Sequence, residues 1–158
     1  MVKCGIGFDV HAFAPNRKLI LGGVEIDYPQ GLAGHSDADV ICHAIADALL
    51  GAAGLGDIGM MFPDTDPANK DISSLVILEK IADRLKQHGY KIINIDVSII
   101  AELPKIAPHS DKMRKTIAAS LRIDKDAVNI KGKTSEHLGF TGRQEGIAAM
   151  AVASVEKL

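Results

Sequence analysis

The stretch ADVICHAIADALLGAAGL, residues 38–55, is the part of this sequence that most clearly predicts a regular element. Apolar side chains recur there at the spacing of one helix face, at Ile41, Ile45, Ala48 and Ala52. Asp39, His43 and Asp47 recur four residues apart, and at about 100° per residue this polar stripe falls nearly opposite the apolar one. We therefore expect a helix with one packed face and one face that carries chemistry.

The segments around this helix predict a sheet and two more helices. Extended segments are expected at Val2–Phe8, Lys18–Ile26 (a hairpin that turns at Gly22-Gly23), Ile92–Ala101, Ala127–Lys133 and Gly146–Val155. Helices are expected from Ser73 or Ser74 to Gln87 and from Ser110 to Leu121, and 56–71 reads as a long loop. We predict an α/β two-layer fold, with a mixed β-sheet packed against about three helices, in a single domain over residues 1–158.

Composition excludes several classes of protein. Of the 158 residues, 47% are hydrophobic and 24% charged, which excludes a disordered chain. There is no Trp and aromatic residues make up 4%, so the core is built from Ala, Ile, Leu and Val, and a base-stacking platform is disfavoured. A formal net charge of −2 offers no basic surface for nucleic acid or an anionic membrane.

The two cysteines and the absence of long apolar runs indicate the compartment. Cys4 and Cys42 are too few for a disulfide framework, and we expect both to be small buried hydrophobes. No apolar run reaches 18 residues. We therefore expect a soluble, cytoplasmic protein.

Three residues form a candidate metal site. Asp9 and His11 are two apart in an extended segment, so their side chains point to the same side. If His43 of the central helix lies near this strand end, two imidazoles and one carboxylate leave a fourth position open, as in catalytic zinc sites. The alternative is that the Asp-x-His spacing arises by chance and that His43 is an ordinary helix residue.

The surroundings of these three residues leave further alternatives open. Asp39 or Asp47 is positioned to accept a hydrogen bond from an imidazole N–H. Cys42 is a less favoured thiolate ligand, because it points away from His43 on the helix.

Four other polar clusters are candidates for function, and three of them also have a plain structural interpretation. Residues 34–39 would bind a phosphate at a helix N-terminus or simply cap that helix. The acids of 62–67 would bind hydroxyls or a cation, or form Asx turns. Segment 131–136 ends in a carboxylate suited to Mg²⁺ or Mn²⁺. In segment 139–143, Arg143 would pair with phosphate or with Glu145.

Seven motifs in order give the chain a resemblance to the 2-C-methyl-D-erythritol 2,4-cyclodiphosphate synthase family. They are GFDVH (7–11), HSDAD (35–39), DALLGAA (47–53), GDIG (56–59), FPDTDP (62–67), TSE (134–136) and GFTGR (139–143). The resemblance covers nearly the whole chain, from Gly7 to about Val155. It implies an enzyme of the non-mevalonate isoprenoid pathway, a lyase that closes a cyclic diphosphate and releases CMP.

The resemblance also implies a role for individual residues. It implies Asp9, His11 and His43 as ligands of Zn²⁺, Glu136 as ligand of Mg²⁺ or Mn²⁺, and His35 and Thr134 as catalytic residues. The residues implied to contact the methylerythritol phosphate are His35, Ser36, Asp57, Ile58, Gly59, Phe62, Pro63, Asp64, Thr65 and Asp66, together with the three zinc ligands. The residues implied to contact cytidine and diphosphate are Ala101, Glu102, Leu103, Pro104, Lys105, Ile106, Ala107, Lys133, Thr134, Ser135, Glu136, Phe140 and Arg143.

The resemblance further implies a homotrimer with active sites between subunits. The ligand that the resemblance implies is a small cytidine diphosphate substrate, and it implies no nucleic-acid or membrane partner. Two rival functions remain from the residues alone: a trimeric binding module with a structural zinc ion, and a metal-dependent phosphohydrolase. The lack of an obvious extra general base near the three ligands disfavours the hydrolase.

Overall fold

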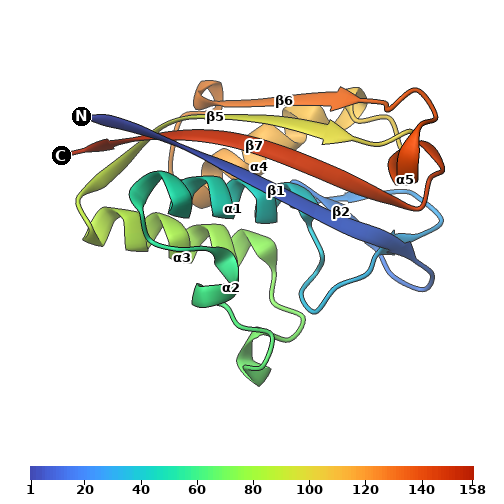
Figure 1. Ribbon diagram of the computed structural model, residues 1–158, viewed down its shortest axis with the longest axis horizontal. Helices are drawn as coiled ribbons and strands as arrows, with labels where there is room; N and C mark the ends of the chain where they lie inside the picture. Colours follow the sequence, from blue (N-terminus) through green and yellow to red (C-terminus); the bar gives the residue numbers. More distant parts are fainter.

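The computed structural model describes residues 1–158 and has two layers, a sheet and a layer of helices (Figure 1). The strand order of the sheet is β4-β1-β7-β5-β6. These strands are β1 (Val2–Ala14), β4 (Gly31–Leu32), β5 (Tyr90–Ile100), β6 (Val128–Lys133) and β7 (Gly146–Lys157). β5 and β6 are parallel and the other neighbours are antiparallel, so the predicted mixed sheet is confirmed.

Three long helices cover one face of this sheet. They are α1 (Val40–Ala53), α3 (Ser74–Gln87) and α4 (Ser110–Leu121), close to the predicted bounds. Two four-residue helices, α2 (Ile58–Met61) and α5 (Gly139–Gly142), lie in segments predicted as loops. The Asp57 side chain caps α2, and a backbone hydrogen bond from Arg143 N–H to the Gly139 carbonyl oxygen closes α5. No helix combines the length and the apolar character needed to span a bilayer.

The predicted hairpin is present and forms a sheet of its own. It consists of β2 (Leu19–Leu21) and β3 (Val24–Ile26), joined by Gly22 and Gly23, both with positive φ. The carboxylate of Asp39, the N-cap of α1, accepts hydrogen bonds from the backbone N–H groups of Gly22 (2.9 Å) and Gly23 (2.6 Å). A buried acid at the start of α1 therefore fixes the hairpin turn against that helix.

Helix α1 packs unusually close to the sheet at two glycines of β1. A Cβ on Gly7 would lie 1.9 Å from the carbonyl oxygen of Ala44, and one on Gly5 would lie 2.2 Å from that of Ala48. The absence of side chains at these positions sets the separation of β1 and α1.

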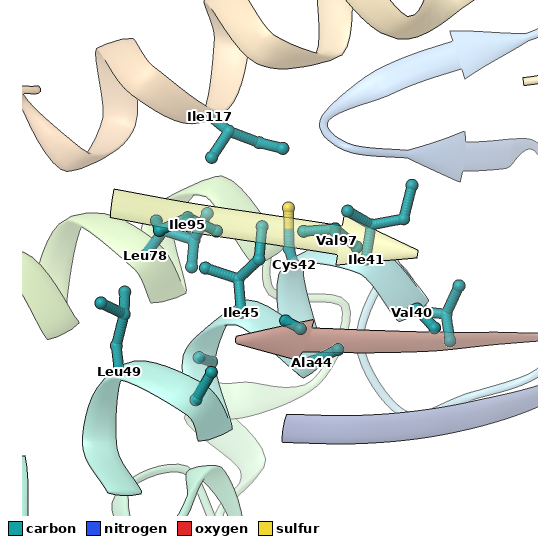
Figure 2. Packing of buried hydrophobic residues seen from close by; sticks show 14 of the residues in the cluster. Val40, Ile41, Cys42, Ala44, Ile45, Leu49, Leu78, Ile95, Val97 and Ile117 are labelled. Atoms are coloured by element: carbon teal, nitrogen blue, oxygen red, sulfur yellow. The ribbon is translucent and has the colours of Figure 1, made fainter. Parts of the chain in front are cut away.

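Helix α1 is buried over a wider surface than the predicted packed face. His43 and Asp47 of the predicted polar stripe are only partly buried, as expected, whereas Asp39 at the N-cap is fully buried. The core surrounds Ile41, Cys42 and Ile45 (Figure 2), and every residue of the helix except His43, Asp47 and Gly51 is buried. The sheet lies on one side of α1, and α3 and the hairpin cover others. Only His43, Asp47 and Gly51, which are spaced four residues apart along one line of the helix, reach the surface.

On the face of the sheet opposite the helices, the part formed by β1 and β7 is open and apolar. Its exposed side chains include Ile6 (64% exposed), Phe8 (54%), Val10 (40%), Met150 (42%) and Val152 (45%). Cys4 shares the alternation of β1 with Ile6 and is exposed, so the prediction that it is buried was wrong. The alternation of β1 turns Cys4 away from the helices, and no other element covers it there.

Candidate functional site

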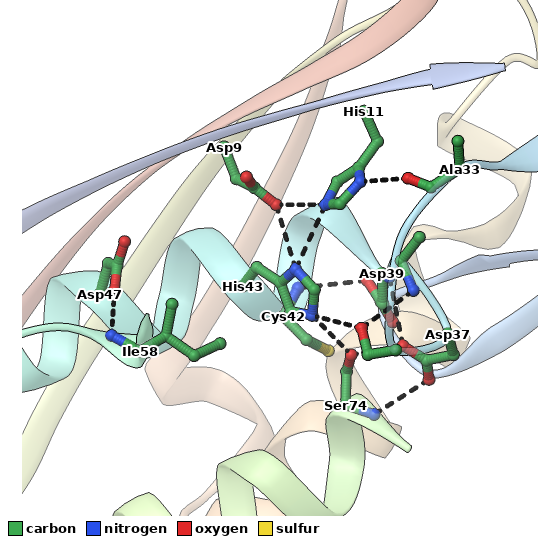
Figure 3. Close-up of polar contacts among 12 residues, drawn as sticks. Asp9, His11, Ala33, Asp37, Asp39, Cys42, His43, Asp47, Ile58 and Ser74 are labelled. Carbon is green, nitrogen blue, oxygen red and sulfur yellow. Dashed lines mark hydrogen bonds and ion pairs between the residues drawn. The ribbon is translucent and has the colours of Figure 1, made fainter. Parts of the chain in front are cut away.

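Asp9, His11 and His43 meet where β1 passes the first turns of α1. Asp9 and His11 point to the same side of β1, and Asp9 Oδ2 lies 2.8 Å from His11 Nε2. From α1, His43 Nδ1 lies 3.1 Å from Asp9 Oδ2 and 3.3 Å from His11 Nε2 (Figure 3). All three potential ligand atoms lie within 4.8 Å of one another. The structure therefore brings together the three residues predicted as a metal site.

The geometry of this cluster fits a tetrahedral metal ion. Ligands about 2.0–2.1 Å from Zn²⁺ in a tetrahedral arrangement are about 3.3 Å apart, close to the separations observed. The side chains of Asp9, His11 and His43 are 27%, 16% and 13% exposed. That residual exposure leaves a fourth position reachable from solvent, as a site that binds substrate requires.

Electrostatics in the cluster favour a bound cation. Burial raises the pKa of Asp9, but hydrogen bonds with His11 and His43 outweigh it and lower that pKa to about 2. Burial lowers the pKa of His11, but the hydrogen bond with Asp9 and the charge of Asp9 outweigh it, so the net pKa is raised. The carboxylate is therefore ionised at neutral pH, and it favours positive charge at the position between the two imidazoles.

The outer nitrogens of the two imidazoles bond to groups that the sequence did not suggest. His11 Nδ1 lies 2.6 Å from the carbonyl oxygen of Ala33. His43 Nε2 lies 3.1 Å from Ser36 Oγ and 3.0 Å from Ser74 Oγ. Figure 3 shows Ser74 on the side of the ring opposite Asp9.

Neither Asp39 nor Asp47 accepts a hydrogen bond from these imidazoles, so that expectation was wrong. Asp39 caps α1 by accepting from the backbone N–H of Cys42 at 3.1 Å, which confirms the capping alternative for this residue. Asp47 accepts from the backbone N–H of Ile58 at 2.8 Å and so fixes the start of α2. Both acids bond to backbone N–H groups nearby instead.

Cys42 is not a candidate ligand. Its side chain points into the core (Figure 2), as the sequence analysis favoured. Burial, with the nearby charge of Asp39, raises the pKa of this thiol well above its usual range. A thiol that stays protonated does not ligate a metal ion.

A cleft of about 310 Å³ opens beside the three ligands. The residues predicted for the methylerythritol phosphate that line it are His35, Ser36, Ile58, Gly59, Phe62 and Asp64. Asn69, Ile72 and Ile77 also line it and were missed, since nothing in their local sequence distinguishes them. The long segment after α1 therefore forms a wall of the cleft.

Four predicted residues of that segment do not line the cleft: Asp57, Pro63, Thr65 and Asp66. Asp57 caps α2 by accepting from Met60 N–H at 2.8 Å. Asp66 accepts from Ala68 N–H at 2.9 Å, which is the Asx turn considered as the alternative. These two carboxylates shape the segment.

A second hollow, of about 190 Å³, lies at the end of β6 and shares no residue with the first. Its lining contains most residues predicted for cytidine, plus Gly132: Ala101, Pro104, Lys105, Ile106, Ala107, Gly132, Lys133 and Thr134. Glu102 and Leu103 are not part of this lining. The Glu102 carboxylate is buried and accepts from the backbone N–H groups of Ser135 and His137, each at 3.1 Å.

The segment after β6 is held by its own side chains. Thr134 Oγ1 donates to Glu136 Oε1 at 3.3 Å. Ser135 Oγ donates to the Leu138 carbonyl oxygen at 2.8 Å and is thereby occupied within the segment. Arg143 pairs with Glu145, Nε to Oε1 at 3.0 Å, which is the alternative to a phosphate contact.

The predicted contact Phe140, in α5, is 38% exposed. Its ring is therefore accessible on the surface of this segment.

Arg17 is another residue of the site region that sequence reasoning missed. Its Nη1 donates to the Gly34 carbonyl oxygen at 2.9 Å and its Nη2 to the Ser36 carbonyl oxygen at 2.8 Å. These bonds brace the loop that carries His35 and Ser36 from outside the cleft. No sequence signal links Arg17 to that loop, because the contact depends on how the hairpin folds back.

Comparison with known sequences gives close full-length relatives. A model of the YgbB family matches residues 2–156. The chain is 55% identical over 157 residues to 2-C-methyl-D-erythritol 2,4-cyclodiphosphate synthase of Chloroherpeton thalassium, covering 99% of this chain and 100% of that protein. It is 56% identical over 155 residues to the synthase of the same name from Caldicellulosiruptor bescii, covering 98% and 99%.

Solved structures agree with these relatives. The bifunctional IspDF protein of Campylobacter jejuni superposes with a TM-score of 0.96 at 42% identity, over 100% of this chain and 43% of that one. A complex of Plasmodium falciparum IspF with CDP gives a TM-score of 0.87 at 33% identity, covering 99% and 96%.

Proposed function

The chain belongs to the YgbB family, whose relatives matched here are 2-C-methyl-D-erythritol 2,4-cyclodiphosphate synthases, and from this we propose how its residues act. The enzyme converts 4-diphosphocytidyl-2-C-methyl-D-erythritol 2-phosphate to 2-C-methyl-D-erythritol 2,4-cyclodiphosphate and CMP, a step of isoprenoid biosynthesis. One observation supports the site assignment most: the ligand atoms of Asp9, His11 and His43 converge beside a cleft that the family's motifs line.

The reaction is an intramolecular phosphoryl transfer. An oxygen of the 2-phosphate forms a bond to the β-phosphorus of the same molecule, while the bond from that phosphorus to the oxygen of CMP breaks. Because a phosphate monoester is already ionised, the attack needs little proton transfer. The obstacles are repulsion between two anions and the entropy of closing an eight-membered ring, so catalysis depends on positioning and on positive charge.

Asp9, His11 and His43 would hold a zinc ion, since two imidazoles and a carboxylate at this spacing are its usual donors. Bound there, Zn²⁺ supplies Lewis-acid stabilisation to phosphate oxygens. His35 and Ser36 lie in the wall of the same cleft, where they would hydrogen-bond the 2-phosphate.

The apolar wall of the cleft would exclude water. Phe62 and Ile58 line it, and water would otherwise compete with the 2-phosphate for the β-phosphorus.

The second hollow would bind the cytidine diphosphate portion of the substrate. The CDP complex of the Plasmodium falciparum neighbour supports a nucleotide ligand for this fold. Lys105 and Lys133 bring positive charge to the lining, and Thr134 brings a hydroxyl. Glu136, a single exposed carboxylate, would bind Mg²⁺ or Mn²⁺, which take one or two carboxylates together with substrate phosphates. Phe140 and Arg143 would complete the contacts.

We further propose that the active protein is a homotrimer with each site between subunits. The metal cluster and the cytidine hollow are separate on one chain, whereas one substrate molecule must reach both. The open sheet face, with Ile6, Phe8, Val10, Met150 and Val152 at 40–64% exposure, is an apolar surface that association would bury. Because a charged substrate does not cross membranes freely, we place the reaction in the cytoplasm.

Phosphorus NMR tests the reaction itself. The protein is incubated with 4-diphosphocytidyl-2-C-methyl-D-erythritol 2-phosphate, Zn²⁺ and Mg²⁺, and we expect CMP together with cyclic diphosphate resonances. CMP with a linear product would identify a phosphohydrolase. No turnover by zinc-loaded protein would identify a binding module.

Subunit mixing tests where the site lies. The variants Asp9→Ala and Glu136→Gln are each expected to lose most activity, because each lacks one half of the site. Co-assembled chains of both kinds regain part of the activity if the two halves come from different subunits. A verified mixed oligomer that stays inactive would place the whole site within one chain.

A further inference from the structure

The outer nitrogen of His43 is enclosed by two serine hydroxyls. Its Nδ1 faces Asp9 and His11, and its Nε2 points the other way, 3.0 Å from Ser74 Oγ and 3.1 Å from Ser36 Oγ (Figure 3). Ser74 begins α3, lines no part of the cleft and has no exposed surface. Its hydroxyl is therefore placed to act on the imidazole and on nothing outside the protein.

The proton of the Ser74 hydroxyl is already engaged by an acid. Ser74 Oγ donates to Asp37 Oδ1, and the backbone N–H of Ser74 donates to Asp37 Oδ2 at 2.9 Å. Since a hydroxyl has one proton, Ser74 Oγ presents a lone pair to His43. It follows that His43 Nε2 carries the proton in this network, and that Nδ1 is free to ligate.

Asp37 is itself fixed by the backbone around it. Its Oδ1 accepts from the N–H of Asp39 at 3.2 Å, in addition to the two bonds from Ser74. The carboxylate therefore connects the start of α1 with the start of α3. A carboxylate held by three donors has little freedom to rotate, so it keeps the Ser74 hydroxyl in a fixed orientation.

We propose that Asp37 and Ser74 are positioning residues for the metal site: they hold His43 as the tautomer that ligates through Nδ1. The inference rests on the metal site of the proposed function. In metal sites, a partner that accepts a hydrogen bond from the outer N–H of a ligating imidazole fixes its orientation and increases its basicity. Here the carboxylate acts through an intervening serine.

Ser36 contributes less than Ser74 to fixing the orientation and tautomer of His43. Its Oγ accepts from the N–H of Ala38 at 3.2 Å and has no carboxylate behind it in the structure. It also lines the cleft, where a substrate would compete for its hydroxyl. Removing Ser74 therefore leaves His43 with a weaker acceptor, and the effect should be a partial loss of affinity.

The test is the affinity of the full-length protein for Zn²⁺ alone, measured by competition with a chelating indicator. Loss of such a partner weakens metal binding about 10- to 100-fold, and Ser74→Ala should lie near the lower end of that range. The matched control is Ser73→Ala, the exposed neighbour that makes no side-chain capping bond, which should bind like wild type. Co²⁺-loaded Ser74→Ala should also show a shifted visible absorption spectrum.

A second variant keeps the test valid if Ser74→Ala does not fold. Asp37→Asn retains Ser74 and the side-chain volume but removes the charge, and it should weaken Zn²⁺ binding in the same direction. If both variants bind Zn²⁺ like wild type, and only their melting temperatures fall, the two residues are merely structural and the proposal is wrong. If wild type itself binds no Zn²⁺, the metal site of the proposed function fails with it.

Discussion

The close approach of β1 and α1 allows a quantitative prediction for Gly7→Ala. The new Cβ would lie 1.9 Å from the Ala44 carbonyl oxygen and 2.8 Å from the Ala48 nitrogen, whereas ordinary contact begins at 3.4 Å. Backbone atoms do not rotate away, so strand and helix must separate by about 1.5 Å at this point. Because Asp9 follows Gly7 on β1 and His43 precedes Ala44 on α1, that separation would pull the ligands apart.

Two quantities should change together in Gly7→Ala. Overpacking of this kind costs about 1–3 kcal/mol of unfolding free energy, measured by urea denaturation of the metal-free protein. Metal sites tolerate ligand displacements of only about 0.2 Å, so Zn²⁺ affinity should fall by more than tenfold.

The matched control is Gly51→Ala on the same helix. A Cβ at Gly51 would have no atom within 4 Å. Replacing a glycine inside a helix with alanine raises the free energy of unfolding by about 0.5–1 kcal/mol. If Gly7→Ala keeps both the stability and the Zn²⁺ affinity of wild type, the reasoning that glycine sets the geometry of the site is refuted.

Three further variants test other parts of the site. Arg17→Met removes two hydrogen bonds to the loop that carries His35, so kcat/KM should fall about 10- to 100-fold with zinc content unchanged; lost zinc would mean that the loop also holds the metal cluster. His43→Ala should lose both zinc and turnover while far-UV circular dichroism stays the same; full zinc stoichiometry would remove it as a ligand. Hydrogen bonds from the backbone N–H groups of His137 and Ser135 hold the pKa of the Glu102 carboxylate below its usual range. The ionised carboxylate therefore contributes its full stabilisation above the usual pKa of Glu, and this stabilisation is lost as the pH falls through the lowered pKa. The melting temperature of wild type should accordingly drop as the pH falls below the usual pKa of a Glu side chain, about 4.3, and that of Glu102→Gln should change less over the same range; equal slopes would exclude this role.

Local sequence patterns were sufficient for most elements and for two of the three candidate metal ligands, whereas the position of His43 beside them was only a condition. α1, α3 and α4 have helical periodicity and recognisable ends, and β5 is rich in the β-branched residues Ile and Val. Asp9 and His11 could be paired because alternation in a strand is a local property.

Features that depend on distant contacts were not predictable from local sequence. The exposure of Cys4 depends on what covers each face of the sheet, and local sequence does not contain that information. Asp39 looked like part of a polar helix face, but the hairpin folds back and supplies two N–H groups to it. Ser74 looked like a helix cap, and its contact with His43 joins residues 31 positions apart in sequence.

The pairing of β1 with β7 places the two ends of the chain next to each other. Val2 lies opposite Glu156, and the N–H of Lys157 donates to the Met1 carbonyl oxygen at 3.2 Å (Figure 1). A short peptide joining these ends would turn β7 and β1 into a hairpin, and the ring could be reopened at the exposed turn near Arg122. Such a circular permutant makes the β1–β7 contacts local and instead separates β6 from β5 and α4 in sequence, so a different part of the sheet should form first. The order in which the sheet assembles thus depends on where the chain is cut, while the arrangement of the metal ligands does not.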